Sequence, residues 1–183
     1  MIRYVLLAFF LALTPALFSQ ETTEETPPLS QRMFYGGSFG FQFGKITFIQ
    51  IDPVAGLWLL PRLNVAAGPS FKYYNDEFGH TTIFGGRAYS EFVFLKDLDN
   101  VIPMSVHLGF FIHGEYEGLS LEKSVFAYDG AAGRIYQGTL LGGAGLSEPV
   151  GPNSSAELEF LWVISGDRYQ LHDVPEFRVM LSF

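Results

Sequence analysis

The sequence predicts an all-β protein in which eight antiparallel strands close into an up-and-down barrel that spans a membrane. The first observation behind this prediction is that one segment after another alternates apolar and polar side chains, which puts one kind on each face of a strand. The second is the presence of 19 Phe, 9 Tyr and 20 Gly among 183 residues, since membrane barrels carry girdles of aromatic residues at the interfaces. The third is the stretch 174–183, in which alternation runs to a final phenylalanine.

The composition argues against several classes of function. The chain contains no cysteine, so a disulfide, a cysteine-bound metal and a lipidated cysteine anchor are all excluded. Its formal net charge of −8 argues against nucleic acid as a partner, because the phosphate backbone is itself negative. The length of 183 residues suits a single folded domain.

Residues 1–19 have the pattern of a signal peptide. Arg3 gives a positive start, and residues 4–18 are apolar with Pro15 near their end. Residues 17–19 then form an acceptable cleavage site. The alternative is a transmembrane anchor, but a spanning helix needs roughly 20 apolar residues, more than this segment offers. We therefore expect export across the inner membrane.

The segment 20–32 separates the expected signal peptide from the barrel domain. It is acidic, polar and contains proline, so it cannot bury a core and is expected to be a flexible leader. A signalling or plug role is the alternative. The barrel domain is expected to cover residues 33–183.

The first half of the barrel domain contains four expected strands. Apolar residues at every second position face outward and small or polar residues face inward, as Phe39 and Phe41 do on either side of Gly40. Pro53 lies inside the second strand and predicts a bulge or weak pairing there. A two-residue turn, 61–62, leads into the third strand. The expected strands are 33–44, 47–60, 63–74 and 82–95.

The second half follows the same rule. Leu158, Phe160 and Trp162 alternate with Glu157 and Glu159, so aromatic and acidic side chains are expected on opposite faces of one strand. The eight-strand count is even, as in bacterial single-chain barrels. The expected strands are 104–117, 135–147, 155–165 and 174–183.

The lengths of the connections predict which end of the barrel faces outside. Segments 75–81, 118–134 and 166–175 are longer than the turn at 61–62, which fits long outer loops and short periplasmic turns. The longest loop, 118–134, is more apolar than a bare loop requires. It is expected either to fold back over the rim or to contact a partner.

The inward face is expected to hold a network of charged residues. An eight-stranded barrel is only wide enough for side chains to fill, so salt bridges there would close the lumen; a narrow ion or proton path is the alternative. A soluble lipocalin-like barrel is disfavoured, since it would bury these charges in an apolar core. The expected lumen residues are Asp52, Lys72, Arg87, Glu91, His107, His113, Glu115, Glu157, Glu159 and Arg178.

The four histidines give no clear sign of a catalytic or metal site. His107 and His113 are expected to face inward, but six residues of extended strand put them about 20 Å apart, too far to share a metal. His80 and His172 are expected in outer loops, with no serine beside either in sequence. The sequence therefore predicts no catalytic, cofactor-binding or metal-binding residue.

The closing stretch carries a resemblance to a known class. Phe177, Val179, Leu181 and Phe183 stand at alternate positions, and this pattern resembles the C-terminal strand of bacterial outer-membrane barrels. The chain after about residue 33 resembles the eight-stranded OmpA/OmpX-like class, in its Bacteroidota-type form. The resemblance implies that the closing strand is an insertion signal read by the barrel-insertion machinery.

The same resemblance sets the expected location and function. It implies a bacterial outer-membrane location, contact with outer-membrane lipid, no cofactor and no enzymatic activity. A structural role or a protein partner at the outer loops is expected. Some small outer-membrane barrels are lipid-modifying enzymes that use a histidine with a serine and an acid, so an enzyme centred on His80 or His172 is one alternative. A narrow channel is the other.

Overall fold

The structure is a computed structural model in which two compact units, Met1–Gln31 and Arg32–Phe183, are distinguished. It describes residues 27–42, 47–76, 79–103, 105–126, 132–152, 154–169, 171–172 and 175–183. The expected signal peptide, most of the leader and the first strand connection therefore lie outside the described residues. A short helix, α2 (Leu29–Arg32), precedes the first strand.

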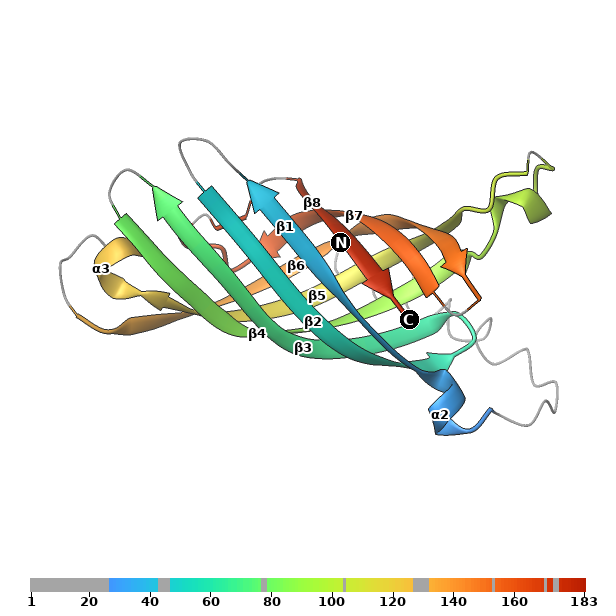
Figure 1. Cartoon of the computed structure of the whole chain (residues 1–183), viewed down its shortest axis with the longest axis horizontal. Helices are drawn as coiled ribbons and strands as arrows, with labels where there is room; N and C mark the ends of the chain where they lie inside the picture. Colours follow the sequence, from blue (N-terminus) through green and yellow to red (C-terminus); the bar gives the residue numbers. More distant parts are fainter. Residues whose placement is uncertain are drawn as a thin grey trace, which may run out of the picture. The chain divides into compact units, whose positions relative to one another are not determined.

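Eight antiparallel strands among the described residues form a closed barrel in which every strand pairs with its neighbours in sequence (Figure 1). This confirms the predicted all-β, up-and-down fold. No helix of the described segments is long and apolar enough to cross a membrane. The strands are β1 (Met33–Gln42), β2 (Thr47–Leu60), β3 (Leu63–Asp76), β4 (Gly79–Leu95), β5 (Gly109–Glu122), β6 (Arg134–Gly151), β7 (Ser154–Ser165) and β8 (Glu176–Ser182).

The first and last strands close the barrel. Phe39 of β1 pairs with Val179 of β8, and Gly36 pairs with Ser182. Tyr35 and Phe183 exchange two backbone hydrogen bonds, with N···O distances of 3.1 and 2.7 Å. Because both edges are paired in this way, the sheet leaves no open strand edge in this part of the wall.

The fifth strand begins and ends later than the sequence predicted. It covers Gly109–Glu122 rather than 104–117, because residues 96–108 form a connection that contains a short 3-10 helix, η1 (Leu98–Asn100). Leu119 and Leu121, expected in a loop, are buried at 1% and 0% exposure. Both side chains point into the barrel as part of β5, which ends at Glu122. The connection to β6 is therefore shorter than the expected loop at 118–134 and begins only after Glu122.

The connections also differ from the predicted pattern of lengths. Asp76 pairs with Gly79, so β3 and β4 form a tight hairpin where the sequence predicted a polar loop at 75–81. The connection 96–108 lies at the same end as the turn at 61–62, where short turns were expected. Connection length therefore does not identify the outward end of this barrel.

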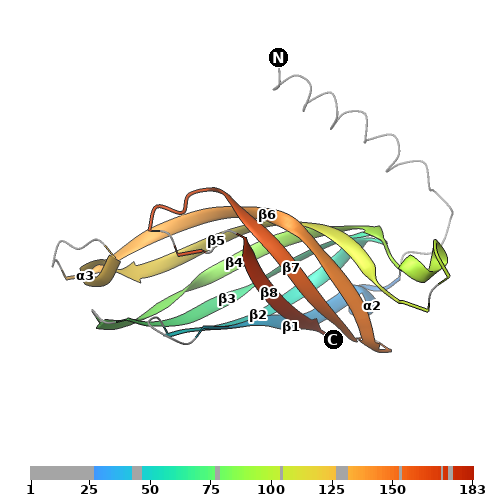
Figure 2. The ribbon, with the colours of Figure 1, turned by 90° about the horizontal axis from the view of Figure 1, so that it is seen from above.

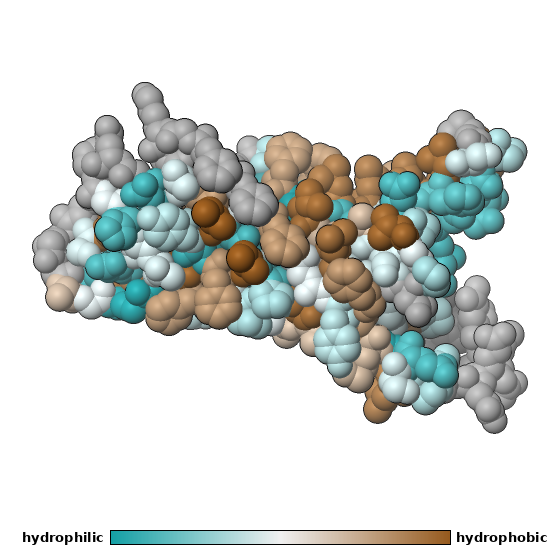
Figure 3. Space-filling view, in the orientation of Figure 1, coloured by the Kyte–Doolittle hydropathy of each residue, from teal (hydrophilic) through white to brown (hydrophobic). Residues whose placement is uncertain are grey.

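The outer wall carries an uninterrupted row of apolar residues that we call the apolar row. Successive strand registers link its members directly, from β4 around all eight strands and back to β4. Hydrophobic side chains gather over the middle of the wall, and polar ones over the end that bears α3 (Figure 3). The row consists of Phe84, Phe71, Ile51, Phe39, Val179, Leu158, Leu146, Phe110 and Leu95.

Along each strand, the residues between the outward-facing ones point into the barrel, and their side chains fill the interior. At one end Ile83, Leu119 and Leu121 form an apolar cluster. A one-turn helix, α3 (Lys123–Phe126), lies at this end beyond β5 (Figure 2). Phe126 packs on the apolar cluster and lies 5.6 Å from the Tyr74 ring. Of the two expected roles for this loop, the structure therefore shows that its start folds back over the rim.

Candidate functional site in the barrel interior

The barrel brings most of the predicted lumen residues together. Glu157 is half-buried, and the other interior members are at most 5% exposed. They come from β2, β3, β4, β5, β7 and β8, and they face one another because inward positions of all strands converge on the barrel axis. The fully interior members are Asp52, Lys72, Arg87, Glu91, His113, Glu115, Glu159 and Arg178.

Glu115 is the centre of the ion-pair network. Its carboxylate accepts hydrogen bonds from Arg178 Nη1 at 2.8 Å and from Arg87 Nη1 at 3.3 Å. The Nε2 of His113 lies 3.2 Å from the same carboxylate. A buried carboxylate is tolerated only when charge and hydrogen bonds compensate its lost hydration, and these three partners supply both.

Asp52 is held by the strands on both sides of β2. Ser70 of β3 donates a hydrogen bond at 2.6 Å and Ser38 of β1 donates one at 3.2 Å, and Gln50 also donates to this carboxylate. Arg87 Nη1 lies 4.0 Å from Asp52. Arg87 therefore connects the Asp52 group to the Glu115 group.

A second layer lies closer to the α3 end of the barrel. Lys72 Nζ lies 2.6 Å from Glu117, and His172 Nε2 lies 2.8 Å from the same carboxylate. Burial lowers the pKa of His172, but the hydrogen bond that the ring donates to Glu117 outweighs this, so the net shift of that pKa is upward. His172 thereby fastens the β7–β8 connection to the interior, together with Asp167, which accepts its backbone N–H at 3.2 Å.

Sequence reasoning missed Glu117 and the interior position of His172. Glu117 has the same parity as Glu115 on one strand, so the alternation itself could have identified it. His172 lies in an irregular connection, where no period indicates direction, and only the folded chain shows it buried.

His107 lies outside the barrel interior, contrary to the prediction. Because β5 begins at Gly109, His107 belongs to the 96–108 connection, and its side chain is 58% exposed. Its Nδ1 lies 2.9 Å from an Asp97 carboxylate oxygen. That hydrogen bond raises the pKa of His107 and lowers the pKa of Asp97.

The closing-strand residues face outward as their alternation predicted. Phe177, Val179, Leu181 and Phe183 are between 36% and 64% exposed. Phe177 makes an edge-on contact with Phe160 of β7, with ring centroids 5.1 Å apart. Their use as an insertion signal remains a prediction.

The two histidines considered for an enzyme lie in different settings. His80 is an exposed residue of β4, not of a loop. His172 is 8% exposed and faces the carboxylates of Glu117, Asp167 and Glu176 at 2.8 to 3.9 Å. Among the described residues, the side chains that pair with the His172 ring are acids rather than a hydroxyl nucleophile.

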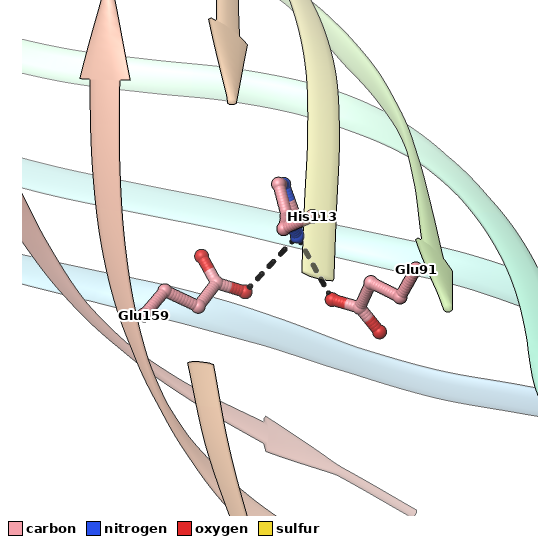
Figure 4. A group of neighbouring side chains, drawn as sticks. All are labelled: Glu91, His113 and Glu159. Atoms are coloured by element: carbon pink, nitrogen blue, oxygen red, sulfur yellow. Dashed lines mark hydrogen bonds and ion pairs between the residues drawn. The ribbon is translucent and has the colours of Figure 1, made fainter. Parts of the chain in front are cut away.

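A third group in the interior gathers possible metal ligands from three strands. Glu91 of β4, His113 of β5 and Glu159 of β7 point toward one another (Figure 4), and one donor atom of each lies within 4.8 Å of the other two. His113 Nδ1 is 3.0 Å from Glu91 Oε1 and 3.7 Å from Glu159 Oε1. We call this group the Glu–His–Glu cluster.

These buried interior groups can neutralise one another, hold a cation or relay a proton. Comparison with known proteins adds no assignment of its own. No protein-family model and no curated protein matches this chain.

Proposed function

We propose that the protein is a non-enzymatic bacterial outer-membrane β-barrel of the OmpA/OmpX-like class. The observation that carries this proposal is the apolar row, in which every residue is apolar on all eight strands. Phe39, Ile51 and Phe71 are each 45–51% exposed. Water would make such a surface an aggregation site, whereas the hydrocarbon of a bilayer matches it.

The interior supports a structural or partner-binding role over a channel. Buried ion pairs occupy the middle of the barrel, and the cluster of Ile83, Leu119 and Leu121 lies across one end. A conducting path needs continuous water, which these side chains displace. The wall and its filled core therefore serve as a rigid membrane scaffold.

The α3 end is the surface that we propose for a protein partner. It displays the β7–β8 connection and a shallow pocket lined by Tyr136, Gln137, Asp167, Arg168 and Tyr169. Arg168 is exposed and Tyr136 is 67% exposed. Exposed Tyr and Arg side chains are the types most enriched at binding hot spots.

The location is tested by fractionating cells that express the full chain and by comparing boiled and unboiled samples on detergent gels. We expect the protein in the outer-membrane fraction, with a boiling-dependent change in mobility. Recovery as a detergent-free soluble monomer would overturn the proposal. Phe183→Ala is expected to reduce the assembled fraction if β8 is the segment read by the insertion machinery.

The function is tested against its two alternatives. Planar-bilayer recordings are expected to show no steady conductance, and lipid A from cells with and without the gene is expected to have the same mass spectrum. A steady current would favour the narrow channel, and altered acylation would favour the lipid-modifying enzyme. Pull-down from intact outer membranes, compared with an Arg168→Ala variant, tests for a partner at the α3 end.

A further inference from the structure

The Glu–His–Glu cluster has the dimensions of a metal site. Zinc binds imidazole nitrogen and carboxylate oxygen at about 2.0–2.2 Å, so ligand atoms around a tetrahedral ion lie roughly 3.3–3.6 Å apart. The two distances from His113 Nδ1, 3.0 Å to Glu91 and 3.7 Å to Glu159, fall on either side of this range. Small rotations of the carboxylates would bring the three atoms around one ion.

The second nitrogen of His113 is already oriented as in a metal-binding histidine. Metal ligands of this type commonly donate their other ring N–H to a carboxylate, which fixes the ring and its tautomer. His113 Nε2 lies 3.2 Å from Glu115, and Glu115 is itself held by Arg178 at 2.8 Å. A proton on Nε2 leaves the Nδ1 lone pair facing Glu91 and Glu159.

Glu159 supplies an independent sign that the cluster takes a ligand. Its side chain is fully buried, and neither carboxylate oxygen accepts a hydrogen bond from any residue that the structure describes. Arg178 Nη1 and His113 Nδ1 each lie 3.7 Å away, beyond hydrogen-bond distance. A buried carboxylate without hydrogen bonds is costly, and a bound cation would remove this cost.

The charge of the surrounding interior also favours a cation. Among the described residues, this part of the interior holds five carboxylates, two of them within the Glu–His–Glu cluster, and two guanidinium groups. Protonation of His113 alone would therefore leave the carboxylates in excess. The carboxylates are Asp52, Glu91, Glu115, Glu157 and Glu159, and the guanidinium groups are Arg87 and Arg178.

We propose that Glu91, His113 and Glu159 bind one divalent transition-metal ion inside the barrel, with zinc as the representative ion. One imidazole and two carboxylates suit zinc and its neighbours better than calcium or magnesium, which prefer oxygen ligands alone. The site lies in the barrel interior and is built from buried side chains alone, so this inference does not depend on the proposed function. It adds a metal site where the sequence predicted none.

The test uses the full chain folded in detergent micelles with zinc present and then freed of excess metal by gel filtration. Metal content is measured by mass spectrometry, and cobalt is substituted to report the ligand geometry by its visible spectrum. The variants are Glu159→Gln and His113→Gln. Glu148→Gln is the matched control, because Glu148 is an exposed residue of β6.

The expected result is about one zinc per chain in the wild type and in Glu148→Gln, and at least a tenfold loss of affinity in Glu159→Gln and His113→Gln. The cobalt spectrum is expected to show a site of low coordination number. Calcium at the same concentration is expected not to displace zinc.

Two results would overturn the proposal. One is a wild-type protein that retains no zinc and gives a cobalt spectrum identical to that of aqueous ion. The other is a Glu159→Gln or His113→Gln variant that retains zinc as the control does. If a variant does not fold, the wild-type metal content and cobalt spectrum decide, since neither measurement depends on the variant.

Discussion

At the scale of single residues, the middle of the barrel interior depends on buried ion pairs. Arg178 contacts Glu115 at 2.8 Å and Glu176 at 2.9 Å, and is 2% exposed. Replacing one partner of a buried pair leaves the other charge without compensation, which costs more than the pair itself contributes. Replacing Arg178 is therefore the most direct test of how much the buried ion pairs contribute to stability.

We expect Arg178→Met to lower the free energy of unfolding by about 3–5 kcal/mol, because it leaves the buried Glu115 carboxylate with weaker compensation. The measurement is urea unfolding of the protein in lipid vesicles. Arg168→Met is the matched control: Arg168 is exposed, so a change within about 0.5 kcal/mol is expected. Equal effects of the two variants would contradict the buried network.

A second residue-scale prediction concerns the exposed pair of His107 and Asp97. The hydrogen bond raises the pKa of His107 above its ordinary value of about 6.5, so its contribution to holding the 96–108 connection is complete below that value. The contribution is lost as pH rises through the raised pKa of His107. At the acid end, the lowered pKa of Asp97 keeps the pair intact until pH falls through that value.

The measurement for this pair is an NMR titration of the His107 ring. Asp97→Asn is expected to bring the pKa of His107 back toward its ordinary value, while Asp167→Asn, at the opposite end of the barrel, is expected to leave it in place. An unchanged His107 titration in Asp97→Asn would show that the 2.9 Å contact does not persist in solution.

At the scale of elements, two prolines lie where the pairing between β2 and β3 is interrupted. Pairing breaks off after Ile51 with Phe71 and resumes at Ala55 with Ala67. Pro53 and Pro69 lie in this interval, and proline has no N–H to give to a ladder. The weak pairing predicted at Pro53 is therefore confirmed.

The close approach in this interval requires glycine at position 68. A Cβ at Gly68 would lie 1.9 Å from the carbonyl oxygen of Pro53, whereas a Cβ at Gly114 would have nothing within 4 Å. We expect Gly68→Ala to destabilise the barrel by about 1–3 kcal/mol, as overpacking does. Gly114→Ala is the matched control and is expected to be neutral or mildly stabilising, with both followed by unfolding in vesicles.

At the scale of the whole molecule, the apolar row shows how strand tilt and membrane contact are connected. The row leaves β4 at Phe84 and returns to the same strand at Leu95, eleven positions further along. One irregularity of register between Val93 and Leu95 contributes to this offset. Closing a barrel requires such a stagger because its strands tilt against the axis. The row of apolar residues therefore follows a spiral path around the outside of the barrel.

We expect Phe71→Arg to disrupt this surface, because Phe71 pairs directly with Ile51 and Phe84 within the row. A charge on the lipid face costs about 2–4 kcal/mol near the bilayer centre. The readout is the free energy of folding into vesicles and the yield of assembled protein. Glu148→Arg, outside the row, is the control, and equal folding of both variants would argue against lipid contact at Phe71.

The sequence by itself determined the fold class, because an alternation of apolar and polar residues with period two indicates a strand and also which residues lie on each of its two faces. Parity alone predicts that Asp52, Arg87, Glu115 and Arg178 face inward, and the structure places all four inside. The same rule failed at His107, since parity carries no information once a strand has ended. The alternation of apolar and polar residues continues through Val106 and Leu108, before β5 begins at Gly109, and it therefore predicts a strand that starts at 104.

Only the tertiary structure decided which inward residues meet. Parity gives a direction but no height along the axis, and that height follows from the stagger between strands, which no local pattern encodes. Glu91, His113 and Glu159 are therefore neighbours only after the barrel closes. The burial of His172 beside Glu117 has the same origin, since it depends on how a connection without period folds into the end of the barrel.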